Sequence, residues 1–159
     1  MKLRLISIIT ISLLFASFSQ TFAEETQKKE RFQVVDKSIV FDAQSGLMWA
    51  SQDNGKDVDW FTAKKYCEEF EAGGYTDWRL PDIKELATLY TEGKKGKSGY
   101  FITDFITITD CCPWSADENM GGAAIFSYNT GKKPAGFLAD TYQLRALPVR
   151  STEKLEMHE

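Results

Sequence analysis

The residue types that carry most hydrolytic and metal-dependent chemistry are scarce in this sequence. Its single histidine, His158, lies beside the C-terminus among polar residues. A Ser-His-Asp triad, a Cys-His pair and a histidine-rich metal site all need an imidazole inside the folded body. The chain also lacks the glycine-rich motifs that bind nucleotide phosphates or dinucleotides. We therefore predict a protein that is not an enzyme and that has no catalytic residue, resident metal or cofactor.

Three cysteines are the remaining candidates for covalent chemistry: Cys67, Cys111 and Cys112. A nucleophile at Cys111 or Cys112 is disfavoured, because thiolate formation needs a nearby base or cation and no histidine can supply it. An odd number of cysteines in an oxidising compartment leaves one thiol unpaired. We predict one disulfide. It joins Cys67 to Cys111 or Cys112, or else it joins the two neighbours and leaves Cys67 buried and reduced.

Asp77 and Arg79 place opposite charges two residues apart, just before a predicted helix and among large apolar residues. Such a pair can bind a ligand or take part in catalysis. Its position is more typical of a buried, charge-assisted network that fixes a loop. We predict a structural pair, so that Arg79→Ala would cost about 3–5 kcal/mol of stability by stranding a buried charge.

The segment after Pro113 combines an aromatic ring with hydrogen-bonding groups. Trp49 and Trp60 fall in apolar patterns typical of a core, whereas Trp114 precedes a polar, turn-like stretch in which a ring is less easily buried. The motifs of calcium-dependent lectins are absent, so a solvated turn is favoured over a calcium site. We predict a ligand-binding loop that contains Trp114, Asp117, Glu118 and Asn119.

Two short basic segments stand out in an acidic chain: Lys94, Lys95 and Lys97 in the segment KKGKSG, and Lys132 and Lys133 after a turn that ends at Gly131. Lysines of this kind are usually only solvated surface. If the two segments meet in space, they form a site for sulfate or carboxylate groups. We therefore add the three lysines of the first segment to the predicted binding site.

The first 23 residues are typical of a secretory signal, with a basic start, an apolar run from Leu5 to Phe18 and small residues before Glu24. The mature chain then has 17 basic and 23 acidic residues, a net charge of −6, which disfavours nucleic-acid binding. No later stretch reaches the roughly 18 apolar residues that span a bilayer. We predict an exported protein, periplasmic or secreted, without a transmembrane segment in the mature chain.

The folded body is expected over residues 32–150, between a charged leader at 24–31 and a polar tail at 151–159. Strand patterns occur at 34–35, 39–41 and 47–49, where they predict a β-hairpin, and again at 113–115, 123–128 and 142–150.

Two helices are predicted between these groups of strands. Asp59 can cap a helix over 60–70, and Asp82 with Glu85 can form a capping box for a second helix that ends near residues 91–93. Neither group of strands is large enough alone to bury a face. We therefore predict an α+β fold in which the two helices pack on one small, mostly antiparallel sheet of N- and C-terminal strands.

The sequence resembles the Lcl C-terminal domain family in the order and spacing of three segments: QSGLMWA at 44–50, WFTAKKYCEEF at 60–70 and GGYTDWRLPDIKEL at 73–86. PWSAD and a closing LRALPVR follow them. The resemblance covers nearly all of 32–150. It implies a C-type-lectin-like fold, related to that of the formylglycine-generating enzymes, and binding of sugars, particularly sulfated polysaccharides. Many relatives carry a cysteine in the closing strand that can reach Cys67, and this chain does not.

These observations together predict an exported, non-catalytic module that recognises a polysaccharide or another envelope component through its loops. One alternative is a structural or protein-interaction domain that docks to an envelope protein. The other is an enzyme related to the formylglycine-generating proteins, which would require reactive, accessible thiols.

Overall fold

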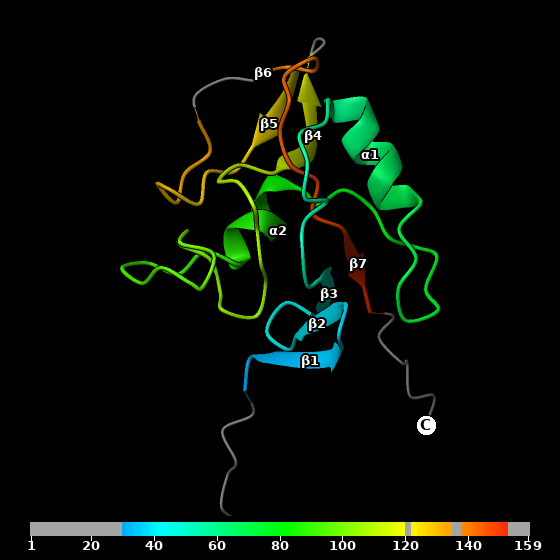
Figure 1. Cartoon of the computed structure of the whole chain (residues 1–159), viewed down its shortest axis with the longest axis vertical. Helices are drawn as coiled ribbons and strands as arrows, with labels where there is room; N and C mark the ends of the chain where they lie inside the picture. The colour runs from blue at the N-terminus through cyan, green and yellow to red at the C-terminus, as the bar shows by residue number, and fades with distance from the viewer. Residues whose placement is uncertain (1–29, 120–121, 135–137, 153–159) are drawn as a thin grey trace, which may run out of the picture.

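The computed structural model describes residues 30–119, 122–134 and 138–152. Within these ranges the chain is α+β, as predicted, with two helices and short antiparallel strands (Figure 1). In chain order the elements are β1 (Phe32–Asp36), β2 (Ile39–Asp42), β3 (Leu47–Ala50), α1 (Trp60–Glu68), α2 (Ile83–Thr88), β4 (Trp114–Asn119), β5 (Gly122–Ile125), β6 (Leu138–Ala139) and β7 (Val149–Ser151).

The strands form two sheets rather than the single predicted one. The first has the order β1-β2-β3-β7 and the second the order β4-β5-β6. The predicted hairpin is β2–β3, and β7 from the far end of the domain pairs with β3 through Trp49 and Val149. The expected meeting of N- and C-terminal strands is therefore confirmed. The residues after Pro113 belong to the second sheet, at the opposite end of the molecule (Figure 1).

Capping residues at their N-termini explain where both helices begin. Asp59 caps α1 by accepting a hydrogen bond from the Thr62 amide at 2.8 Å. Asp82 and Glu85 form the predicted capping box of α2. This helix ends at Thr88, earlier than predicted, because Tyr90 already pairs with Ile102 in an antiparallel bridge.

Two apolar clusters hold the layers together, and each belongs to one sheet. The first joins the four-stranded sheet to α2 and includes Trp49, Leu86 and Leu147. The second joins the three-stranded sheet to α1 and includes Trp60 and Trp114. The apolar face of α1 packs against the second sheet, whereas α2 belongs to the cluster of the first sheet and its N-terminus also contacts β4.

The ends of the folded body reach slightly beyond the expected limits. Arg31, assigned to the leader, donates two hydrogen bonds to the buried carboxylate of Asp42, at 2.9 and 2.8 Å. Ser151 belongs to β7, and the Thr152 hydroxyl donates to the Gly46 carbonyl at 2.7 Å. The predicted signal, most of the leader and most of the tail lie outside the described residues. No helix in the described part of the chain is long and apolar enough to cross a membrane.

Candidate functional site

Trp114 does not offer a surface to a ligand, which corrects the sequence-based prediction. Its side chain is fully buried, and its indole Nε1 donates a hydrogen bond to the Val58 carbonyl at 2.9 Å. The polar residues after it suggested a turn, yet residues 114–119 form strand β4. Since β4 lies against α1 within the second apolar cluster, the ring at its first position points into the core.

The acidic residues of β4 have different surroundings from one another. The Asp117 carboxylate accepts hydrogen bonds from the Ile83 amide and from the Ser115 hydroxyl, both at 2.7 Å. It thereby satisfies one of the free amides at the start of α2, a structural role. Burial raises the pKa of Asp117, but these bonds and the charge of Lys133 outweigh it and lower the pKa overall. Glu118 is exposed, and Asn119 pairs with Gly122 across the hairpin. The predicted four-residue ligand loop does not exist as such.

Asp77 and Arg79 do not pair with each other, so the predicted ion pair is wrong. Asp77 accepts from Arg150 at 2.6 and 3.1 Å, and Arg150 also stacks on the Tyr75 ring. Arg79 instead binds Glu85 through two hydrogen bonds of 2.8 and 2.6 Å. Asp77 binds a residue of β7 and Arg79 binds a residue of α2, so the two side chains have partners in different elements. Both contacts tie loop 73–81 to these neighbouring elements.

The cysteines adopt the second of the two predicted arrangements. Cys111 and Cys112 are joined as neighbours, and Cys67 is a buried, free cysteine on α1. Burial raises the pKa of the Cys67 thiol, so this group stays protonated at neutral pH. The part of the chain that the structure describes holds no group of three or more metal-ligating side chains.

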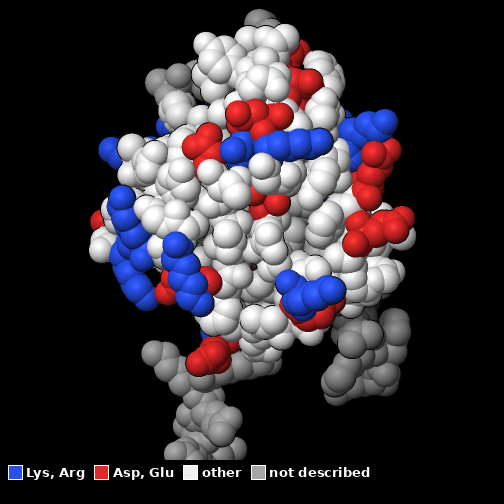
Figure 2. Space-filling model, viewed as in Figure 1, with Lys and Arg blue, Asp and Glu red and all other residues white. Residues whose placement is uncertain are grey.

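The two basic segments lie close together, around a pair of aromatic rings. Gly131 packs directly on the Tyr90 ring, and the exposed Lys132 is the next residue in the chain. The Lys95 ammonium lies 5.5 Å from the centre of the Phe101 ring, and the Tyr90 and Phe101 rings are 6.1 Å apart. Figure 2 shows basic side chains along the edge of the molecule where Figure 1 places the 94–99 loop. We call the exposed residues Lys94, Lys95, Lys97 and Lys132, with Tyr90 and Phe101, the lysine surface.

One acidic residue already contacts the lysine surface. Asp104 accepts from the Lys94 ammonium at 3.2 Å and from the Lys97 amide at 2.9 Å. The Lys94 hydrogen bond, then that of the Lys97 amide, lowers the pKa of Asp104, so its carboxyl stays ionised at neutral pH. The ion pair is exposed on both sides, and such pairs contribute little and exchange readily. Lys133 lies closer to Asp117, whose pKa its charge helps to lower.

The comparisons with known proteins agree with the resemblance stated above. The model of the Lcl C-terminal domain family matches residues 38–150. The chain belongs to this family. A search of curated proteins found no significant match. The family match starts after β1 and includes both helices and all but the end of β7, so it covers the second sheet, most of the first sheet and the lysine surface.

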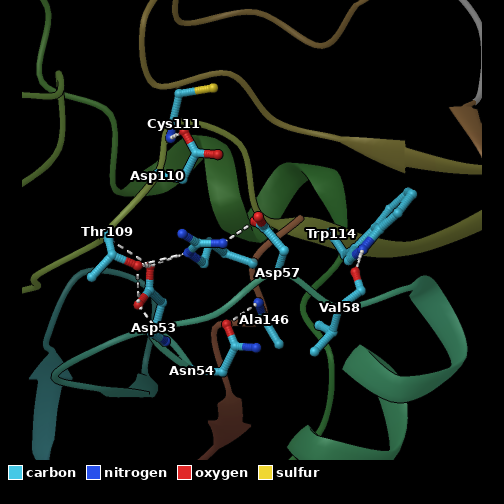
Figure 3. Close-up of polar contacts among 11 residues, drawn as sticks. Asp53, Asn54, Asp57, Val58, Thr109, Asp110, Cys111, Trp114 and Ala146 are labelled. Atoms are coloured by element: carbon cyan, nitrogen blue, oxygen red, sulfur yellow. Dashed lines mark hydrogen bonds and ion pairs between the residues drawn. The ribbon is translucent and has the colours of Figure 1, made fainter. Parts of the chain in front are cut away.

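A polar cluster around the buried Asp53 carboxylate, which sequence reasoning missed, holds loop 51–58 of this Lcl C-terminal domain in place. The Asp53 carboxylate accepts from the Thr109 amide at 2.6 Å and from the Gly55 amide at 2.9 Å. Arg145 donates to the Thr109 hydroxyl at 2.7 Å and also binds Asp57. Figure 3 shows Asp53 and Thr109 facing each other across the cluster. These residues come from distant parts of the chain, so no local motif could reveal them.

Two hollows of about 230 and 270 Å³ share Tyr66 of α1 as a lining residue. The first is lined by Ser51, Gln52 and Phe70, among others. Asn54 and Lys65 help to line the second. We call these hollows together the Tyr66 groove. Tyr66 alone gave no sequence signal, because the hollows depend on how loop 51–58 is folded against the helix.

Proposed function

We propose that this Lcl C-terminal domain is an exported, non-catalytic module that binds an anionic glycan at the lysine surface. The observation that carries the proposal is the meeting of two basic segments, 94–97 and 131–132, around the Tyr90 and Phe101 rings. Aromatic rings offer apolar faces to sugar rings, and ammonium groups beside them attract sulfate or carboxylate groups. The sugar binding implied by the family resemblance supports the same choice.

The charge distribution favours a local interaction. The chain as a whole is acidic, so long-range attraction does not draw a polyanion to it. Binding then depends on short-range contacts with Lys95 and Lys132, and on whether a ligand sulfate replaces Asp104 at Lys94. Because the lysines are exposed, salt should weaken such binding; the screening length is about 8 Å at physiological ionic strength.

Dextran sulfate and unsulfated dextran are a matched pair of probes for this proposal. We expect the folded protein to bind dextran sulfate, to bind dextran much more weakly, and to lose affinity between about 0.05 and 0.3 M salt. The Lys95→Ala/Lys132→Ala variant should bind dextran sulfate roughly tenfold or more weakly. The Lys37→Ala/Lys84→Ala variant, which removes two exposed lysines elsewhere, is the control. Equal losses in both variants would show that only net charge matters and would reject the lysine surface as a site.

A protein-interaction role is the second candidate, and strand β1 favours it. This strand is the edge of the four-stranded sheet, and Val34 and Val35 are 63% and 50% exposed. Exposed apolar residues on an edge strand are suited to pairing with another chain. If dextran sulfate does not bind and Val34→Lys abolishes cross-linking of β1 to a defined envelope protein, this second function replaces the first.

Enzymatic activity of the formylglycine-generating kind would need an accessible thiol, and Cys67 is buried while Cys111 and Cys112 are joined. Thiol titration of the folded, oxidised protein tests this alternative. A rapidly reacting thiol would bring the enzyme back into consideration.

A further inference from the structure

The disulfide between Cys111 and Cys112 joins two neighbours in the chain, so it does not connect distant elements. In the chain-entropy model, a disulfide stabilises a fold by closing a loop in the unfolded chain, and the effect grows with the length of that loop. A bond from Cys67 to either neighbour would have closed a loop of about 45 residues. The observed bond closes the shortest loop possible, so stabilisation of the fold does not account for it.

Hydrogen bonds hold the backbone around the pair independently of the sulfur atoms. The Cys111 amide donates to the Asp110 carboxylate at 2.6 Å, and the Cys111 carbonyl accepts from the Tyr128 amide at 2.9 Å. Just after the pair, the Trp114 amide donates to the Arg145 carbonyl at 2.9 Å. Sulfur takes no part in these three contacts, so they can persist when the disulfide opens. The segment can therefore change its redox state without unfolding.

The pair is accessible, whereas the third cysteine is not. Cys111 and Cys112 are half-buried, and Figure 3 shows the Cys111 sulfur pointing away from the polar cluster around Asp53. Cys67 is fully buried, and burial raises the pKa of its thiol. Because thiolates rather than thiols attack disulfides, the protonated Cys67 does not compete with a thiolate from outside.

We propose that Cys111 and Cys112 form a thiol–disulfide exchange site, whose reaction partner is a dithiol such as the reduced active site of a disulfide oxidoreductase. Exposed disulfides are the ones that exchange readily, whereas buried structural ones resist reduction. The proposal does not depend on glycan binding at the lysine surface, because it uses sulfur chemistry alone.

The exchange has two steps, each of which forms one disulfide bond and breaks another. A thiolate of the dithiol attacks one sulfur of the pair, which gives a mixed disulfide and releases the other cysteine as a thiolate. The second thiolate of the dithiol then attacks the partner's sulfur in the mixed disulfide and releases the remaining cysteine. The dithiol gives up two electrons and two protons and becomes a disulfide, while Cys111 and Cys112 become two thiols.

Reduction followed by alkylation of the folded, full-length protein tests the proposal. The oxidised protein is treated with about 1 mM dithiothreitol and then with iodoacetamide, and the modified cysteines are identified by mass spectrometry of its peptides. We expect Cys111 and Cys112 to be alkylated roughly tenfold or more faster than Cys67, which should react only after urea is added. The Cys67→Ala variant is the matched control and should be reduced at the wild-type rate. Reduction of the pair only in urea, a disulfide that includes Cys67, or three free thiols in the oxidised protein would overturn the proposal.

Thermal unfolding separates an exchange site from a structural crosslink. The reduced protein and the Cys111→Ser/Cys112→Ser variant should both keep a Tm within about 3 °C of the oxidised protein, because a two-residue loop adds little. A fall of more than about 10 °C on reduction would show a structural crosslink and reject the exchange site. Glutathione provides an independent measurement, since both redox forms should be populated in buffers of reduced and oxidised glutathione. A pair that stays fully oxidised in all such buffers would also contradict the proposal.

Discussion

Trp114 shows how burial decides the role of a single residue. Its surroundings in the sequence are polar, and only the tertiary structure places α1 over the first position of β4. Trp49 and Trp60 were assigned to the core correctly, because their own neighbours already form an apolar strand and an apolar helix face. A ring can thus be predicted as buried where the local pattern is apolar, and not where distant elements cover it.

Replacing Trp114 should therefore affect stability rather than binding. Trp114→Ala leaves a large cavity in the second apolar cluster, so we expect a loss of about 3–5 kcal/mol in the free energy of unfolding. Phe61→Ala, at a ring that is 62% exposed on α1, should change it by less than about 0.5 kcal/mol. Urea denaturation measures both. A stable Trp114→Ala protein that no longer binds a glycan would restore the original assignment of this residue to a ligand site.

At the scale of elements, local signals were reliable and partners across the chain were not. The caps of α1 and α2 need only residues within one turn, so Asp59, Asp82 and Glu85 were identified from spacing alone. Glu85 has a further role that spacing did not reveal, since it also binds Arg79. The ion-pair partner of a charged side chain in an exposed loop depends on which element packs beside the loop.

The separate partners of Asp77 and Arg79 can be tested by double-mutant cycles. Arg79→Ala should cost about 1–2 kcal/mol, less than expected for a buried pair, because the Arg79 side chain is 42% exposed. Its effect should add to that of Asp77→Ala within about 0.5 kcal/mol. Arg79→Ala combined with Glu85→Ala should instead show a coupling of about 0.5–2 kcal/mol. Strong coupling between positions 77 and 79 would contradict the observed pairing.

For the whole molecule, the sequence was sufficient to predict the class, both helices and the pairing of the two ends. It did not reveal that the strands divide into two sheets, because both groups of strands have similar short patterns and their pairing depends on contacts between distant parts of the chain. The lysine surface could be predicted only on the assumption that the two basic segments meet in space. The Tyr66 groove could not be predicted, since it lies between α1 and loop 51–58, which hydrogen bonds with residues 107–109 and 144–146 hold in place.

The link between Arg31 and Asp42 ties the N-terminal end of the domain to the rest. Asp42 is fully buried, and Arg31 also donates to the carbonyl of Thr88 at the end of α2, at 2.7 Å. Burial raises the pKa of Asp42, but the hydrogen bonds from Arg31, Ser45 and the Gln44 amide outweigh it, and the pKa lies below the ordinary value of 3.8. The ionised form is thus favoured in the folded state, so this contact joins β1, β2 and α2 at neutral pH.

The stability of the domain should accordingly depend on Asp42 in acid. Because the folded pKa is lower than the unfolded one, the stabilisation is complete well above 3.8 and is lost as the pH falls below this value toward the folded pKa. We expect Asp42→Asn to lower the unfolding free energy by about 1.5–3 kcal/mol at pH 7, since a charged hydrogen-bonding partner of Arg31 is removed. The difference from wild type should stay constant down to about pH 5 and shrink below it. Glu71→Gln, at an exposed carboxylate, is the control, and urea denaturation from pH 7 to about 3 provides the measurement. A difference that grows in acid would mean that the Asp42 carboxyl is protonated more readily in the folded protein than in the unfolded chain, contrary to the contacts with Arg31.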